Sequence, residues 1–305
     1  MSTSAPPALP RHLAIGILLF VGTASALNHI AARIAFDDEA GVLLAIMCRS
    51  GLSGLALFGI VLWQQHPVRL PAGRGRWQAA VGLLIALQSL CLYSAVARIP
   101  VALALLIASL FPILLALLSW ALGGPPPTRR ASLLMAAILA GLVLVLDLAT
   151  VLGSGADMGP EWAPGILFAL GSAGFFAIAL WITDHRLSTL AGPVRGMYTI
   201  AIVFCSMLAA GAAGIVPGGL HSPASSVGWI ALAALSVLYA ATFSVLFISI
   251  PRLDMARNSP VMNIEPVASL VLGWLILDQT LNGRQLLGGA IVLGCIVALA
   301  YSRKR

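Results

Sequence analysis

The amino-acid sequence predicts an all-α membrane protein with ten transmembrane helices, built as two inverted five-helix repeats. Three observations predict this fold class: the composition, the spacing of the apolar runs and a similarity between the two halves. Of the 305 residues, 60% are hydrophobic and only 9% are charged, and the mean hydropathy is +1.01. A soluble domain carries roughly 25% charged residues. This chain has too few charges to cover a water-facing surface of ordinary size.

The apolar runs are each long enough to cross a bilayer, which takes roughly 20 helical residues. Polar backbone groups in lipid must be paired within their own segment, so each run is expected to be a helix. The breaks between the runs are short and hold turn residues or charges, and the tightest of them is Arg98–Pro100. The runs cover residues 12–36, 40–63, 75–97, 101–122, 131–150, 161–183, 190–216, 226–250, 257–277 and 284–302.

The basic residues predict how the chain lies across the membrane. If the N-terminus is cytoplasmic, twelve basic residues fall in cytoplasmic segments and three on the opposite side. The positive-inside rule then places both termini in the cytoplasm of a bacterial-type inner membrane. The same rule accounts for the formal net charge of +7, so we expect no nucleic-acid partner.

The two halves of the chain resemble each other at an offset of 154 residues, which aligns Phe111-Pro112 with Glu265-Pro266. Five helices per half is an odd number, so the second half must cross the membrane in the opposite orientation. Inverted repeats are typical of secondary transporters, which bind substrate near the bilayer midplane between the repeats. The sequence therefore predicts a transporter with a first repeat over 1–150 and a second over 151–305.

Pro112 and Pro266 are expected near the centres of the fourth and ninth helices. A proline inside a helix removes one backbone hydrogen bond and weakens the helix there. Each proline is therefore either a static kink or a moving hinge, and the sequence leaves both interpretations open.

The closing segment resembles the EamA group of the drug/metabolite transporter superfamily. The resemblance is specific over 263–298, weak over 93–146, and extends over the whole chain in helix count and repeat size. Asp278 stands where the group usually has Glu. The residues that carry the resemblance are Glu265-Pro266-Val267-Ala268, Gly273, Leu277-Asp278, Leu281, Gln285 to Ile291 and Gly294.

The resemblance implies an exporter with a central cavity lined mainly by the first, third, fourth, sixth, eighth and ninth helices. The fifth and tenth helices would brace it from outside. Within the group the chain looks most like the exporters of aromatic and other hydrophobic amino acids. Exporters of amphipathic drugs, purines or other metabolites remain the alternative.

Polar side chains inside the first and third helices are candidate substrate contacts, because a polar group in a membrane helix is costly unless it has a role. Asn28 and His29 lie within one turn of the first helix, and Gln88 and Tyr93 lie on the third. Tyr93 offers both a ring and a hydroxyl to an aromatic solute. The alternative for each is hydrogen bonding between packed helices.

Four further candidates for substrate binding lie in the second half. Phe176 is a possible stacking wall, and Tyr239 lies deep in its helix. Thr242 aligns with Gln88, so a polar position recurs in both halves, and Asn263 lies close to Glu265. Packing between helices is again the alternative interpretation.

Glu265 is the one acidic residue expected deep in a helix. One hypothesis makes it a proton-coupling or amine-binding carboxylate. The other makes it a structural acid that caps groups freed by Pro266 or pairs with an arginine such as Arg49. The EamA resemblance favours the structural role, because the group has an acid here across many substrates.

Other classes of function fit the sequence less well. Gly51-Leu52-Ser53-Gly54 matches the GxSG of intramembrane serine proteases, but the later candidate histidines all lie at loops or helix ends. A receptor-like protein would not need an inverted repeat. We therefore expect no catalytic residue, cofactor or metal, and a monomer whose partners are the lipid bilayer and a small-molecule substrate.

Overall fold

A computed structural model gives the fold, and it describes residues 9–65, 67–71, 73–124, 126–145, 159–216, 218–249, 253, 264–279 and 282–302. Within these ranges the regular elements are all helices. They are α1 (Arg11–Asp37), α2 (Val42–Trp63), α3 (Gly75–Val96), α4 (Val101–Ala108), α5 (Phe111–Ala121), α6 (Arg129–Val145), α8 (Trp162–Arg186), α9 (Gly192–Ala212), α10 (Ser226–Ser249), α12 (Ile264–Leu277) and α13 (Gly283–Ser302).

Seven spans among the described residues are long and apolar enough to cross a membrane: α1, α2, α3, α4 together with α5, α8, α9 and α10. The predicted break at Arg98–Pro100 is confirmed, because α3 ends at Val96 and α4 begins at Val101. α12 is apolar over its 14 residues, but residues 257–263, with which the ninth run was predicted to begin, lie outside the described part. The chain is a multi-pass membrane protein, and the total of ten spans stays a prediction.

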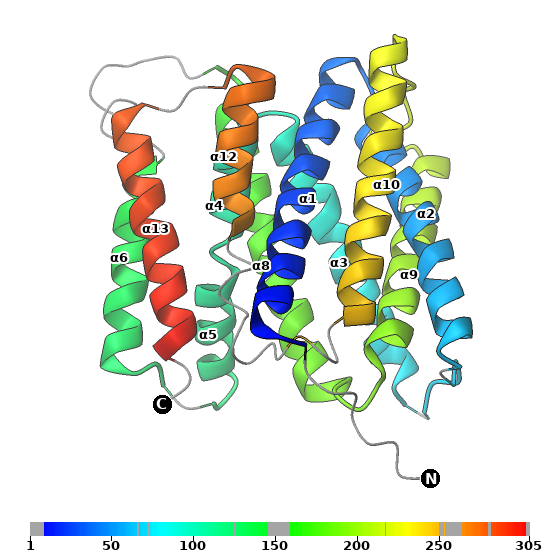
Figure 1. Cartoon of the computed structure of the whole chain (residues 1–305), viewed down its shortest axis with the longest axis horizontal. Helices are drawn as coiled ribbons and strands as arrows, with labels where there is room; N and C mark the ends of the chain where they lie inside the picture. Colours follow the sequence, from blue (N-terminus) through cyan, green and yellow to red (C-terminus); the bar gives the residue numbers. More distant parts are fainter. Residues whose placement is uncertain are drawn as a thin grey trace.

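The helices lie side by side, and the two chain ends lie at the same end of the bundle (Figure 1). Corresponding helices of the two halves run in opposite directions. The helix pairs also repeat: α3 packs on α8 as α10 packs on α1, and α3 packs on α9 as α10 packs on α2. Likewise α8 packs on α4 and α5 as α1 packs on α12, while α6 and α13 pair with each other at one edge. The boundary between 150 and 151 lies outside the described residues.

The sequence predicted one continuous helix for the fourth span. In the structure this span is divided between α4 and α5. Pro112 lies in the first turn of α5 and has no N–H to donate to the carbonyl four residues earlier. The chain turns instead at Ser109 and Leu110, where the Leu110 N–H donates to the Ile107 carbonyl at 3.1 Å. The Ser109 hydroxyl donates to the Leu105 carbonyl at 2.7 Å. Pro112 therefore marks an interruption rather than the centre of a helix.

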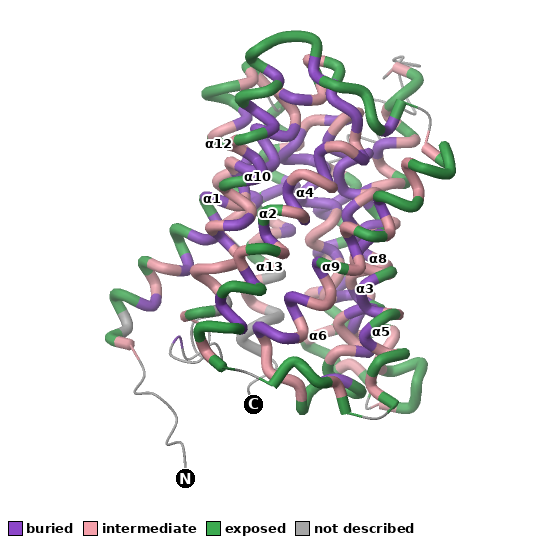
Figure 2. Tube along the Cα trace, turned by 90° about the vertical axis from the view of Figure 1, so that its right-hand side faces the viewer, coloured by how far each residue is buried: buried purple, intermediate pink, exposed green. Residues whose placement is uncertain are grey.

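Buried residues follow the inner faces of the helices, and exposed ones gather on the outer faces and at the ends (Figure 2). Large apolar side chains are among the exposed ones, including Leu55, Leu133 and Leu167. This arrangement suits a bundle whose outer surface meets lipid tails. The core side chains are mostly Ala, Leu, Ile and Val, and the largest one that is fully buried is Tyr93.

The two halves are joined by hydrogen bonds at the end opposite the chain termini. The Gly41 N–H donates to the His221 carbonyl at 2.8 Å, and the Leu44 N–H donates to the Gly219 carbonyl at 2.9 Å. Asp38 follows α1 and lies at the start of α10. Its backbone carbonyl accepts from the Ala224 N–H at 2.9 Å, and its carboxylate accepts from the Ser225 N–H at 2.8 Å. We call these four hydrogen bonds the end clamp.

Candidate functional site

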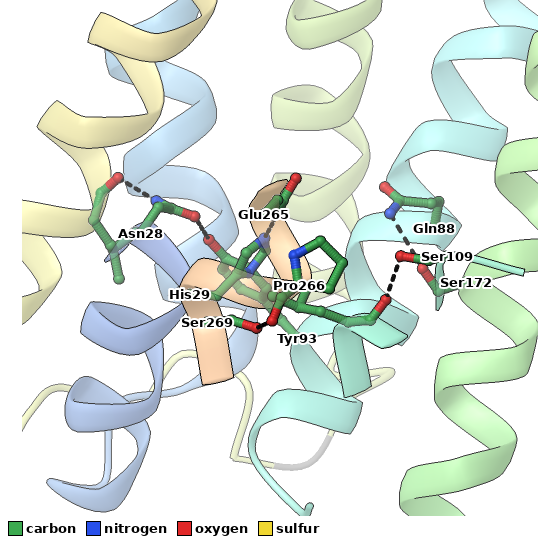
Figure 3. A network of polar contacts seen from close by, with 11 residues as sticks. Asn28, His29, Gln88, Tyr93, Ser109, Ser172, Glu265, Pro266 and Ser269 are labelled. Carbon is green, nitrogen blue, oxygen red and sulfur yellow. Dashed lines mark hydrogen bonds and ion pairs between the residues drawn. The ribbon is translucent and has the colours of Figure 1, made fainter. Parts of the chain in front are cut away.

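Tyr93 is the centre of a polar cluster inside the bundle (Figure 3). It lies on α3, its side chain is fully buried, and its hydroxyl donates to Asn28 Oδ1 on α1 at 3.1 Å. Asn28 Nδ2 in turn donates to the Leu235 carbonyl on α10 at 2.5 Å. Two residues predicted from the sequence therefore bind each other and link three helices from both halves of the chain.

His29 and Glu265 form the charged part of this cluster. His29 Nε2 lies 3.4 Å from Glu265 Oε1, and the pair is an ion pair when the imidazole is protonated. The His29 ring also meets the Tyr93 ring edge-on, with 5.8 Å between the centroids. The His29 side chain is 8% exposed and that of Glu265 is 32% exposed, so the carboxylate is the accessible member.

A glycine on α1 allows this pair to form. Gly22 lies against the first turn of α12, and a Cβ at this position would collide with Ile264 Cγ2. Small residues at such contacts let membrane helices approach closely. The close approach of α1 to α12 at Gly22 brings His29 within reach of Glu265.

Arg49 on α2 also contacts Tyr93, and the sequence analysis did not place it in the site. Its guanidinium carbon lies 4.2 Å from the centroid of the Tyr93 ring and 4.3 Å from that of the Tyr239 ring on α10. The residue is 4% exposed. The pair between Glu265 and Arg49 that the sequence left open is therefore not found, and Glu265 lies next to His29 instead. A basic residue inside the second apolar run was the signal that could have indicated Arg49.

Tyr239 and Thr242 lie one turn apart on α10. The Tyr239 ring is half-buried and packs on Phe243 at 4.4 Å between centroids. Thr242 is 3% exposed, and its hydroxyl has no hydrogen-bond partner among the described residues. Tyr239 thus joins the cluster through Arg49.

Gln88 and Phe176 belong to a second group on the α8 side of the bundle. Gln88 Nε2 donates to Ser172 Oγ at 3.2 Å, which links α3 to α8. Phe176 packs edge-on against Phe111, with 4.8 Å between centroids, at the start of α5. The structure therefore divides the predicted contacts between two groups instead of one.

The last two predicted positions lie on or next to α12. Asn263 falls outside the described residues. Pro266 is buried in the first turn of α12, and its carbonyl accepts from the Ser269 hydroxyl at 2.8 Å. It also borders an almost wholly apolar pocket of about 290 Å³ between α4, α12 and α13.

The sequence model of the EamA-like transporter family matches this chain twice, over residues 12–147 and 163–301. The chain belongs to the EamA-like transporter family. A search of curated proteins gave no match. A solved structure titled only "Crystal structure of protein" has a TM-score of 0.63 and 21% identity, over 97% of this chain and 99% of that chain. This likeness shows the fold alone.

As an EamA-like protein the chain is a membrane transporter, and its geometry gives no support to the protease alternative. Ser53, the serine of the GxSG match, is fully buried and donates to the Arg49 carbonyl of its own helix at 2.6 Å. A nucleophilic serine needs a base within hydrogen-bond reach of its hydroxyl. The Ser53 hydroxyl is instead bonded to a backbone carbonyl.

Proposed function

We propose that this EamA-like protein is a secondary transporter that exports small organic solutes, with aromatic and other neutral amino acids as the main class. The supporting observation is the polar cluster around Tyr93, which draws Asn28, His29 and Glu265 from helices of both family matches. A substrate site between inverted repeats can be exposed to one side of the membrane and then to the other. The proposal includes a monomer in the bacterial inner membrane, with both termini cytoplasmic.

The geometry supports an aromatic solute because rings surround the polar groups. Tyr93 and Tyr239 lie in the cluster, and Phe111 and Phe176 form a second aromatic pair on the α8 side. Aromatic rings prefer edge-on or offset packing with a further ring. Asn28, Gln88 and Thr242 add neutral polar groups that can bind the backbone atoms of an amino acid.

Glu265 is proposed as the group that couples transport to protons. Its side chain is more accessible than that of its partner His29, from which its carboxylate lies 3.4 Å away. Protonation of the carboxylate would weaken the His29 contact and free α12 from α1. A purely structural role predicts a loss of stability instead of a loss of coupling.

Flux into proteoliposomes tests the proposal. Labelled phenylalanine, tryptophan, threonine and a nucleoside are offered with and without a pH gradient, to the wild type and to Glu265→Gln. We expect saturable phenylalanine or tryptophan flux that other aromatic amino acids inhibit. Glu265→Gln should abolish gradient-driven accumulation and leave exchange in place. Flux of the nucleoside alone, or of no amino acid, would refute the substrate class and direct the search to purines and amphipathic drugs.

A further inference from the structure

We infer that Arg49 is an anchor for the carboxylate of the transported solute, so that this transporter selects solutes bearing a carboxylate over their neutral or cationic analogues. The inference rests on the proposed function and specifies which group of the substrate is recognised. It starts from a buried charge that has no counter-charge among the described residues.

A buried guanidinium in a membrane helix is costly. A charged side chain inside a membrane helix opposes insertion of that helix into the bilayer. Such residues normally pair with acids or with backbone carbonyls. Within the described part of the chain, Arg49 has no carboxylate within ion-pair distance, because the three pairs found there are His29–Glu265, Arg33–Asp37 and Arg98–Glu161. Its Nε is buried and has no hydrogen-bond partner among the residues that the structure describes.

The tyrosines hold the guanidinium in position without neutralising it. The closeness of the guanidinium to the Tyr93 and Tyr239 rings supplies cation–π attraction, and Tyr93 also forms a side-chain hydrogen bond with Arg49. Arginine binds a carboxylate through two parallel hydrogen bonds from the edge of its guanidinium. Among the described residues Nε has no acceptor, so this N–H is open to the carboxylate of a solute.

Access to Arg49 is expected from the Tyr239 side. Tyr93 is fully buried, whereas Tyr239 is half-buried and belongs to α10 of the other half. Glu265, the acid of the cluster, lies next to His29, whose ring contacts Tyr93 edge-on. With no acid of the described residues paired to it, the charge of Arg49 would attract a carboxylate and repel a cationic drug.

Equilibrium binding of matched ligands tests this inference. Purified protein is titrated with 3-phenylpropionate, 3-phenylpropanamide, phenylalanine and phenylalaninamide, and binding is followed by thermal shift and by competition with labelled phenylalanine. Losing a hydrogen bond to a charged group costs about 1.5–3 kcal/mol, so we expect each carboxylate to bind at least about tenfold more tightly than its amide. Arg49→Gln should remove this preference. Arg33→Gln is the matched control, since Arg33 already pairs with Asp37 and donates to the Val96 carbonyl at 3.0 Å, and it should keep the preference.

The outcomes separate the inference from the proposed function. Equal affinity for acids and amides in the wild type would overturn the inference even if amino acids are transported. So would an Arg49→Gln protein that loses stability but keeps the acid preference, because Arg49 would then be structural. Binding of 3-phenylpropionate in an Arg49-dependent way, without amino-acid flux, would support the anchor and refute the amino-acid assignment. Should Arg49→Gln fail to fold, Arg49→Lys keeps the charge and should retain the acid preference with weaker binding.

Discussion

Two contacts that correspond in the repeated fold carry different chemistry. Phe111 and Glu265 align in the two halves, each just before a proline. Glu265 on α12 meets His29 on α1, whereas Phe111 on α5 meets Phe176 on α8. The helix pair α1–α12 corresponds to the pair α8–α5, so the same packing position holds an acid–imidazole pair in one half and two rings in the other.

This difference shows that the repeat preserves how the helices pack, while the side chains at the corresponding contacts differ. We call the acid–imidazole pair of His29 and Glu265 the polar wall, and the ring pair of Phe111 and Phe176 the aromatic wall. A solute with one polar end and one aromatic end matches such a pair of walls. The predictions below alter one wall while the other serves as the reference.

The largest effect is expected when the polar wall is converted into a copy of the aromatic one. The double variant His29→Phe with Glu265→Phe should fold, because an aromatic pair already fills the corresponding position. It should lose gradient-driven transport by about a hundredfold or more, since the titratable pair and its charge are both gone. Flux in proteoliposomes and size-exclusion chromatography measure the two outcomes. Transport near the wild-type rate would show that the titratable pair has no role in coupling.

A smaller effect is expected at the aromatic wall. Phe111→Ala and Phe176→Ala should each raise the KM for phenylalanine several-fold and leave the dependence on the pH gradient intact. A double-mutant cycle on thermal stability should give a coupling of about 0.5–1.5 kcal/mol, the usual range for an edge-on aromatic pair. Additive effects of the two substitutions would contradict a direct contact between the rings.

The two prolines give the next comparison. Pro112→Ala restores an N–H that can bond to the Ala108 carbonyl and close the interruption between α4 and α5. If that interruption is a hinge, turnover should fall a few-fold while KM and stability are kept or improved. The matched change Pro266→Ala tests α12 in the same way. Unchanged turnover in Pro112→Ala would identify a static break.

The smallest effect is expected at Asp38, far from both walls. Hydrogen bonds from the Ser225 backbone N–H, and then from its side chain, hold the pKa of Asp38 below its ordinary value of 3.8. A lowered folded-state pKa stabilises the protein above the unfolded value and loses that contribution as the pH falls through the folded value. The melting temperature of the wild type should therefore decrease as the pH is lowered below about 4, and that of Asp38→Asn should decrease less steeply. Parallel curves for the two proteins would exclude this contribution.

The sequence predicted more of the fold than of the candidate site. Apolar runs, short breaks and the offset of the repeat indicate the helices and their directions, because lipid leaves the backbone few alternatives. The division of the fourth span could not be located from Pro112 alone, because a proline permits a kink, a break or a first turn. The sequence also indicated Asn28, His29, Tyr93 and Glu265 as candidate site residues, and in the structure these four side chains lie in one cluster.

The sequence did not predict which side chains of the site contact each other. One of the interpretations left open for Glu265 paired it with an arginine such as Arg49, whereas in the structure its carboxylate lies 3.4 Å from His29 Nε2. Arg49 was left out because its contacts are aromatic rings, one from α3 and the other from α10 in the second half of the chain. Pairings of this kind depend on helix rotation, which a hydropathy pattern does not determine.

The end clamp joins the two halves mainly through backbone groups, and the opposite end of the bundle is joined in a different way. There the Arg74 side chain donates to the Arg186 carbonyl, and the Tyr198 hydroxyl donates to the Val68 carbonyl at 2.9 Å. A state that opens one end of the bundle must break the hydrogen bonds of that end. With alternating access, the bound solute would therefore have to offset backbone contacts on one face of the membrane and side-chain contacts on the other.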